Sequence, residues 1–160
     1  MNNAGPYRVR VSAAVLRPGD ELLVVRESHM ALAVVNLPGG APQIGETLER
    51  AVVREVLEET GYEVVPTEIA FVAEKRSDRY SSSALEVCFY ARIASRAQRE
   101  PVSGDGVQVV EWLPLGHADL RRHLPHTALF AQSKRGRYID QASRAETAGY
   151  EGAGARGRKP

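Results

Sequence analysis

The sequence predicts an α/β domain with a mixed β-sheet. Short apolar segments of the kind that form strands recur along the chain, and one long and one short helical segment separate them. A length of 160 residues suits one domain, and 43% hydrophobic with 26% charged residues excludes a wholly disordered chain. Strands interleaved with helices are typical of the α/β class.

Three strands are expected before the long helix. Residues 8–16 alternate at first and are rich in valine, and residues 21–26 form a more buried run after a Pro-Gly-Asp turn at 18–20. Residues 31–37 are apolar. The sequence LPGG at 37–40 predicts a forced turn, because proline lacks an amide donor and glycine tolerates positive φ.

A long helix is expected over residues 46–60, which contain no glycine or proline and consist mostly of good helix formers. Gly61 occupies the position at which a glycine commonly ends a helix. At about 100° per residue the apolar side chains share one side of this helix. They are Leu48, Val52, Val53 and Val56.

The second half of the chain predicts further strands and a short helix. Strands are expected over residues 64–74, with a break near Pro66, and then over 84–93 and 107–113. A polar turn is expected between the first two of these strands, over residues 75–83. The short helix is expected over residues 117–123, ending before Pro125.

The net charge of +1 conceals a division along the chain. Residues 1–120 hold 12 basic and 17 acidic side chains, whereas residues 121–160 hold 9 basic and 3 acidic ones. The last 20 residues are rich in glycine and alanine and offer little to bury. We therefore expect a folded domain over residues 1–140 and a flexible basic tail over residues 141–160.

The sequence indicates a cytoplasmic location without membrane attachment. Cys88 is the sole cysteine, so no intramolecular disulfide can form. The first residues lack the apolar core and cleavage site of a secretory signal, and the longest apolar runs are far shorter than the ~18 residues that span a bilayer.

Three carboxylates crowd the second half of the long helix. Glu55, Glu58 and Glu59 lie at i, i+3 and i+4, so all three fall within an arc of about 100°. Like charges at these spacings destabilise a helix, and the helix dipole disfavours anions near its C-terminus. A bound Mg²⁺ or Mn²⁺ would offset both penalties, since both ions prefer oxygen ligands. The alternative is a solvated acidic face.

The residues around this cluster extend the pattern to G-x5-E-x7-R-E-V-x-E-E-x-G, running from Gly40 to Gly61. This pattern resembles the signature of the Nudix hydrolase family. Tyr62 departs from it, because the family usually has an aliphatic residue there. The LPGG loop before the pattern and the sequence EWLPL at 111–115 are also similar to members of the family. The resemblance covers roughly residues 8–125.

The resemblance implies the Nudix fold, an α/β/α sandwich around a mixed central β-sheet. It also implies hydrolysis of a nucleoside diphosphate linked to another moiety, with a divalent metal. Arg54 would orient the glutamates, and Glu46 would help tie the loop to the helix. The implied metal ligands are the Gly40 carbonyl, Glu55, Glu58 and Glu59.

The general base stays open at this stage. Some family members take it from the signature helix, which would make it a glutamate such as Glu55, and others from a later loop. Asp105 and Glu86 are the candidates for a late acidic residue, and each is alternatively a solvated surface acid.

The substrate is expected to be a small nucleotide, with a dinucleoside polyphosphate or a nucleoside triphosphate favoured. Tyr80 lies 18 residues after Tyr62, a spacing seen in dinucleoside polyphosphate hydrolases of the family. Arg76 and Arg79 lie beside it and could contact phosphates. The alternative is a charged hairpin loop with an incidental tyrosine.

Two other functions compete with a small-nucleotide hydrolase. One is a non-catalytic Nudix-fold module that binds a nucleotide as a regulator, although such modules typically lose the glutamates that are intact here. The other is hydrolysis at RNA 5′ ends, in which the basic C-terminal segment would contact RNA. The sequence carries no information on the oligomeric state.

Overall fold

The computed structural model describes residues 7–29, 32–77, 82–94, 107–131 and 137–141. Its helices are α1 (Leu48–Thr60) and α2 (Ala118–His123), and a 3-10 helix, η2 (Pro125–Ala131), follows α2. The strands are β1 (Tyr7–Arg17), β2 (Glu21–His29), β3 (Leu32–Asn36), β4 (Gly39–Gly40), β5 (Val64–Ser77), β6 (Ser82–Ile93), β7 (Val107–Pro114) and β8 (Arg137–Gln141).

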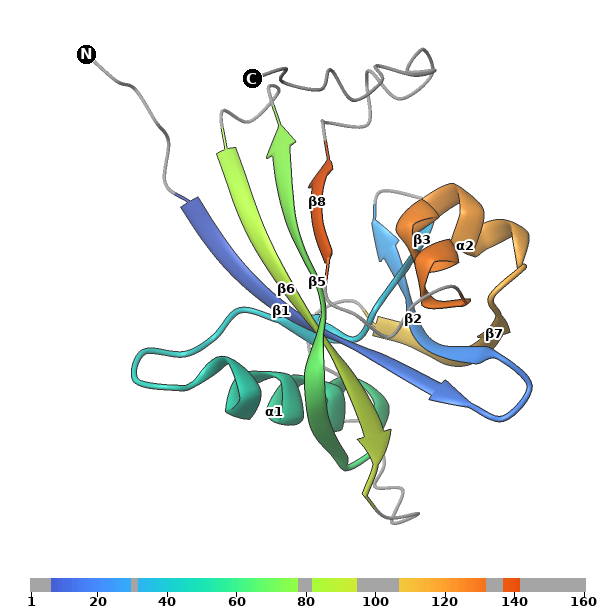
Figure 1. Ribbon diagram of the computed structural model, residues 1–160, viewed down its shortest axis with the longest axis horizontal. Helices are drawn as coiled ribbons and strands as arrows, with labels where there is room; N and C mark the ends of the chain where they lie inside the picture. The colour runs from blue at the N-terminus through green and yellow to red at the C-terminus, as the bar shows by residue number, and fades with distance from the viewer. Residues whose placement is uncertain (1–6, 30–31, 78–81, 95–106, 132–136, 142–160) are drawn as a thin grey trace, which may run out of the picture.

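The described strands form one mixed sheet in the order β3-β2-β1-β6-β5-β8, with β4 paired to β1 and β7 to β2. Strand β1 runs parallel to β6 and β5 runs parallel to β8, whereas the other pairs are antiparallel. Strands β1 and β2 pair only beside their hairpin and then diverge, so β2 continues with β3 and β7 (Figure 1). This divergence leaves room for β4 on the free edge of β1.

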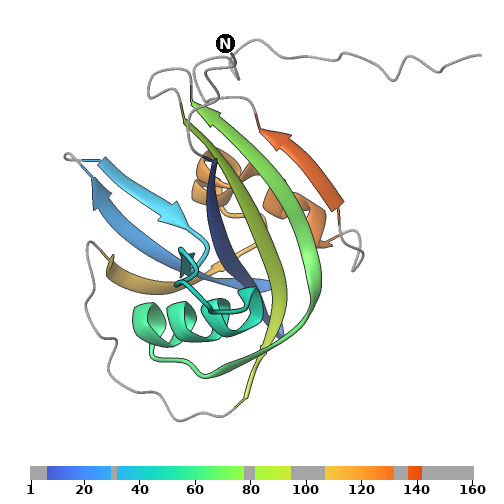
Figure 2. The same cartoon turned by 90° about the vertical axis from the view of Figure 1, so that its left-hand side faces the viewer.

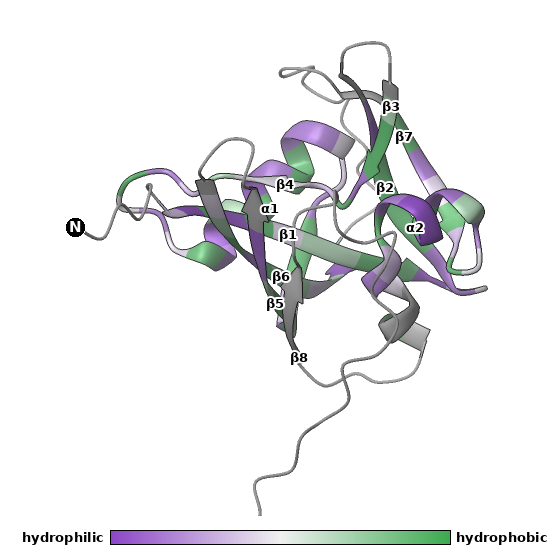
Figure 3. Cartoon of the chain, turned by 90° about the horizontal axis from the view of Figure 1, so that it is seen from above, coloured by the Kyte–Doolittle hydropathy of each residue, from purple (hydrophilic) through white to green (hydrophobic). Residues whose placement is uncertain are grey.

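Alternating side chains of β1 enter two separate cores. Val11, Ala13 and Val15 pack with the apolar side of α1, whereas Ala14 belongs to the cluster that includes Leu120 of α2 and Phe130 of η2. Figure 2 shows α1 and α2 on opposite sides of the strands. In Figure 3 much of β2 is hydrophobic, whereas both helices alternate between hydrophilic and hydrophobic residues. The expected α/β class with helices on both sides of a mixed sheet is confirmed.

The long helix forms where the sequence predicts it, but it begins two residues later. Thr47 is its N-cap and its hydroxyl accepts a hydrogen bond from the amide of Arg50, which leaves Glu46 in the preceding loop. Gly61 ends the helix in the left-handed conformation with φ of 73°, as expected. Val52 and Val56 are fully buried, which confirms the predicted apolar side.

Three local predictions about turns were wrong. Residues 75–77 and 82–83 continue β5 and β6, so no polar turn spans 75–83, although residues 78–81 lie outside the described chain. Strand β5 does not break near Pro66, because a shift in register between Pro66 and Glu68 accommodates the missing amide. In the LPGG segment, Gly39 and Gly40 pair with β1 as β4.

Two elements were not predicted at all, η2 and β8. Strand β8 is a short edge strand whose sequence RYIDQ alternates weakly, and it forms because β5 offers it a parallel partner. The predicted tail falls almost entirely on residues 142–160, outside the described residues, so the division into domain and tail stays a prediction.

Within the described part, neither helix is long and apolar enough to cross a membrane, and Cys88 is a buried free thiol.

Gly39 lies where no other residue fits without strain. A Cβ atom there would collide with the carbonyl oxygen of Val11 and the Cα of Ser12, and its φ is +151°. Both obstacles are backbone atoms of the central strand, so they cannot move aside. The close contact between β4 and β1 therefore depends on this glycine.

We expect Gly39→Ala to lower the free energy of unfolding by about 3–5 kcal/mol, because it adds a steric collision to an unfavourable φ. Gly45→Ala is the matched control. Gly45 also has a positive φ, of 82°, but no atom lies within 4 Å of a Cβ placed there, so its loss should be about 1–2 kcal/mol. Urea unfolding of both variants measures the difference, and equal losses would contradict the argument.

Candidate active site

Three glutamates of the signature belong to α1, namely Glu55, Glu58 and Glu59. Two of them, Glu55 and Glu59, contact β4. Gly40 and Glu55 are in direct contact, since a Cβ atom on Gly40 would overlap the carboxylate of Glu55. Glu59 accepts a hydrogen bond from the amide of Gly39 at 2.8 Å. The structure therefore brings Glu55 and Glu59 to the same two-residue strand, whose glycines leave room for both carboxylates.

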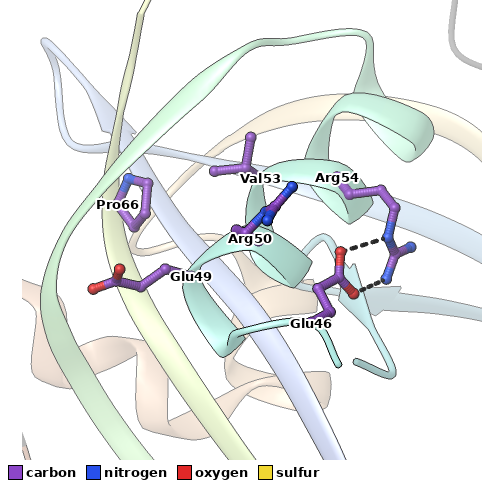
Figure 4. Close-up of a pocket in the computed structure, with 6 residues that line it drawn as sticks. All are labelled: Glu46, Glu49, Arg50, Val53, Arg54 and Pro66. Carbon is purple, nitrogen blue, oxygen red and sulfur yellow. Dashed lines mark hydrogen bonds and ion pairs between the residues drawn. The ribbon is translucent and has the colours of Figure 1, made fainter. Parts of the chain in front are cut away.

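Arg54 connects this glutamate cluster to the loop before the helix. Its guanidinium makes two hydrogen bonds to Glu46, at 3.0 and 2.8 Å, which Figure 4 shows as a paired contact. The same side chain donates to Glu55 at 2.8 Å and to Glu58 at 3.3 Å. A further bond to the carbonyl of Ala41 completes the link. The expected roles of Arg54 and Glu46 agree with these contacts.

The loop that carries Glu46 is closed on itself as well. The amide of Gln43 donates to the carboxylate of Glu46, and the amide of Glu46 donates to the carbonyl of Gln43. Glu46 therefore has partners on both sides, the loop backbone and Arg54. Its hydrogen bond with Arg54 and that with the Gln43 amide hold the pKa of Glu46 at about 2, and the contact with Glu46 raises the pKa of Arg54.

Glu59 has the opposite electrostatic environment. Burial raises the pKa of Glu59 to about 7, and the Gly39 amide and the positive charge of Arg10 oppose this rise only in part. The surroundings of the Glu59 carboxylate therefore hold too little positive charge to offset its burial. A bound divalent cation would supply that charge.

The donor set fits a hard divalent cation, although the described side chains are not yet gathered around one point. Among the described residues no three acidic, histidine or cysteine side chains converge as a ready metal site. Arg54 engages Glu55 and Glu58, and the Glu58 side chain is 47% exposed. All candidate donors are oxygens on one helix face and one adjoining strand, which is the chemistry that Mg²⁺ and Mn²⁺ prefer.

The predicted substrate-binding residues are largely outside the described chain. Arg79, Tyr80 and the candidate late acid Asp105 are not among the described residues. Arg76 belongs to β5, where its backbone pairs with Ser83, but its side chain is not described. Their place relative to the glutamate cluster therefore stays a prediction.

Glu86, the other candidate late acid, is not a solvated surface acid. It is 3% exposed on β6, and its carboxylate lies 2.6 Å from the Lys75 ammonium and 3.9 Å from the Arg10 guanidinium. Burial raises the pKa of Glu86, but the Lys75 ammonium, the Ser12 hydroxyl and the charge of Arg10 together outweigh burial and hold this pKa below its ordinary value. Sequence analysis did not select Arg10. Arg10 alternates with Arg8 at the start of β1, so the local pattern gave no signal that sets it apart.

A pocket of about 450 Å³ lies on the outer side of α1 (Figure 4). It is lined by Glu46, Glu49, Arg50, Val53, Arg54 and Pro66, so Glu46 is its one signature glutamate, and Glu55, Glu58 and Glu59 do not line it. The pocket therefore lies beside the Glu46–Arg54 ion pair, and it is separate from the helix face that carries Glu55, Glu58 and Glu59.

Comparison with known families and structures agrees with this geometry. A family model described as NUDIX domain matches residues 6–133, well over half of the chain. No curated protein matched the sequence.

Many solved structures share the fold. A NUDIX hydrolase from Nitrosomonas europaea superposes with a TM-score of 0.66 at 23% identity, covering 75% of this chain and 79% of that one. A MutT NUDIX hydrolase from Burkholderia pseudomallei has a TM-score of 0.61 at 27% identity, covering 69% and 85%. The NUDIX domain of Shewanella oneidensis NrtR, complexed with ADP ribose, has a TM-score of 0.60 at 24% identity, covering 81% and 90%.

The chain therefore belongs to the NUDIX domain family. Its enzymatic class is that of the Nudix hydrolases, which confirms the class expected from the sequence.

The Glu46–Arg54 pair predicts how stability depends on pH. Because the folded-state pKa of Glu46 is about 2, against an ordinary 4.5, its ionised form stabilises the fold. This contribution should be complete above pH 4.5 and should disappear as the pH falls through 2. We expect Glu46→Gln to be less stable than the parent protein near neutrality and to approach it towards pH 2.

Thermal unfolding of both proteins at a series of pH values measures this difference. Glu68→Gln, on an exposed part of β5, controls for the removal of one carboxylate. A gap between parent and Glu46→Gln that stays constant from pH 2 to 7 would contradict the assignment.

Proposed function

We propose that this protein is a metal-dependent pyrophosphohydrolase that cleaves a phosphoanhydride bond of a nucleoside diphosphate linked to another moiety. The observation that carries the proposal is the meeting of the α1 glutamates with the β4 glycines, where Glu55 packs on Gly40 and Glu59 binds the Gly39 amide. The family of the chain supports the reaction class.

The proposed metal ligands are Glu55, Glu58, Glu59 and the carbonyl of Gly40, with Mg²⁺ or Mn²⁺ as the ion. When bound, such an ion neutralises phosphate oxygens and activates water for attack on phosphorus. The protein itself supplies the orientation. Arg54 holds Glu55 and Glu58 on one side of the helix, and Glu46 keeps Arg54 and the loop at residues 41–46 in place.

A carboxylate must accept the proton of the attacking water. Glu55 is our candidate on the signature helix, because its side chain contacts Gly40 and is largely buried. Asp105 is the candidate from a later loop.

The favoured substrates are dinucleoside polyphosphates or nucleoside triphosphates. Strands β5 and β6 pair up to Ser77 and Ser82, so Arg79 and Tyr80 belong to the short connection between the two strand ends. Tyr80 would stack on a second base, and Arg76 and Arg79 would contact additional phosphates. We also propose a cytoplasmic location and a flexible basic tail over residues 141–160.

Two alternatives give different results in one chromatographic screen of nucleotide hydrolysis with Mg²⁺ or Mn²⁺. A regulatory module would bind a nucleotide such as ADP ribose, which the NrtR domain binds, without turnover. An enzyme for RNA 5′ ends would act on triphosphorylated RNA and poorly on free nucleotides. Turnover of free nucleotides supports the proposal over both.

We expect Glu58→Gln to lower kcat by at least about a hundredfold, because a neutral amide is a poor ligand for a divalent cation. The fold should be unaffected, since Glu58 is half exposed and has one long contact with Arg54. Glu49→Gln, an exposed glutamate in the first turn of the same helix, is the matched control and should retain activity. Undiminished turnover by purified Glu58→Gln would refute the metal assignment.

The substrate proposal makes a separate prediction. Tyr80→Ala should raise KM for diadenosine polyphosphates by about tenfold, the loss of one stacking contact, and should change KM for simple triphosphates less. Steady-state kinetics on both substrate types measures the ratio. Equal effects on the two, or no effect on either, would reject the role of Tyr80.

A further inference from the structure

Glu86 and Arg10 form a charged pair in the middle of the sheet. They are Cα partners in the parallel pairing of β6 with β1, so their side chains leave the sheet next to each other. Glu86 is 3% exposed, and Lys75 of β5 contacts its other oxygen. A buried carboxylate is costly unless it is paired with positive charge.

Lys75 is the nearer of the two cations to Glu86, at 2.6 Å against 3.9 Å for Arg10. Arg10 is therefore a second cation, and its best hydrogen bond goes elsewhere. Its guanidinium donates to the carbonyl of Leu37 at 3.1 Å. It also lies close enough to Glu59 for its charge to act on that carboxylate. Arg10 thus joins the buried charge of Glu86 to the segment that leads into β4.

The backbone of residues 37–40 is held from one side by β1. The amide of Ala13 donates to the carbonyl of Pro38 at 3.0 Å, and Gly39 and Gly40 pair with Ser12 and Val11. The Leu37 side chain packs in the core that includes Ala14 of this strand, and the Leu37 carbonyl accepts its hydrogen bond from Arg10. The direction of the next amide, that of Gly39, decides whether it reaches Glu59.

We propose that Arg10 is a positioning residue that holds residues 37–40 so that the Gly39 amide meets Glu59, and that Glu86 serves to orient Arg10 and does not accept the proton of the attacking water. The arrangement is a property of the protein without metal. Only its effect on catalysis rests on the proposed function.

Amide hydrogen exchange of Gly39, measured by NMR on the full chain without metal, tests the arrangement directly. In Arg10→Met the Gly39 amide should exchange about tenfold faster, corresponding to the loss of one hydrogen bond that secures the segment. Arg10→Lys keeps the charge and should fall between the parent and Arg10→Met. Arg92→Met, an exposed arginine at the far end of β6, is the matched control and should leave the exchange rate unchanged.

A double variant separates a shared role from two independent ones. If Glu86 acts through Arg10, then Arg10→Met combined with Glu86→Gln should exchange no faster at Gly39 than the more affected single variant. Additive effects would overturn the proposal. An unchanged exchange rate of the Gly39 amide in both Arg10→Lys and Arg10→Met would also overturn the proposal. If Arg10→Met does not fold, Arg10→Lys decides the outcome alone.

Kinetics then distinguishes positioning from proton transfer. Glu86→Gln should lower kcat by about tenfold with the acidic limb of its pH profile preserved, and Arg10→Lys should recover part of the activity that Arg10→Met loses. Loss of the acidic limb in Glu86→Gln, with Gly39 exchange unchanged, would identify Glu86 as the general base and overturn the proposal. Absence of turnover by the parent protein on every nucleotide of the screen would refute the proposed function while leaving the exchange results to stand.

Discussion

The close contact between β4 and β1 is the constraint on which the candidate site depends. Two glycines bring the backbone of residues 39–40 against the central strand, at a distance that a Cβ atom on Gly39 would not permit. The same absence of side chains opens the other side of this segment to the carboxylates of Glu55 and Glu59. The site therefore depends on backbone that the sheet itself holds in place.

Charge balance around the glutamates is divided between two arginines with different roles. Arg54 is saturated by acids and fastens the loop to the helix, so the N-terminal entry to α1 is rigid. Arg10 lies on the other side of the glutamate cluster. Its guanidinium donates a hydrogen bond to the Leu37 carbonyl, and its positive charge acts on Glu59 and Glu86. Neither arginine fully compensates Glu59, whose burial leaves it short of positive charge. This deficit is what makes the cluster suited to a cation.

The division of charge along the sequence acquires a structural meaning only in part. The acidic excess of the first 120 residues centres on α1 and its preceding loop, where Arg50 and Arg54 face five glutamates. A further ion-pair network, in which Arg26 contacts Glu111 and Asp119, joins β2, β7 and α2 away from this cluster. Among the described residues, acids outside the Glu55–Glu59 cluster such as Glu46, Glu111 and Asp119 are thus paired with neighbouring arginines.

The sequence by itself determined the class of the fold, the signature helix with its buried valines and its glycine end, and the identity of the glutamates, because helical periodicity and motif spacing are local properties. The sequence did not show that Glu46 lies outside the helix, because a single hydrogen bond from the Arg50 amide to the Thr47 hydroxyl fixes where the helix begins. It missed β8 and the joining of β5 to β6 beyond residue 75, because edge strands form on partners that are distant in sequence. Tertiary structure alone decided that Glu86 is buried between two cations and that Arg10 reaches Leu37. The first fact arises from the register of β1, β5 and β6, in which Arg10 precedes both Lys75 and Glu86 by more than 60 residues, and the second joins residues 27 positions apart, which no local pattern encodes.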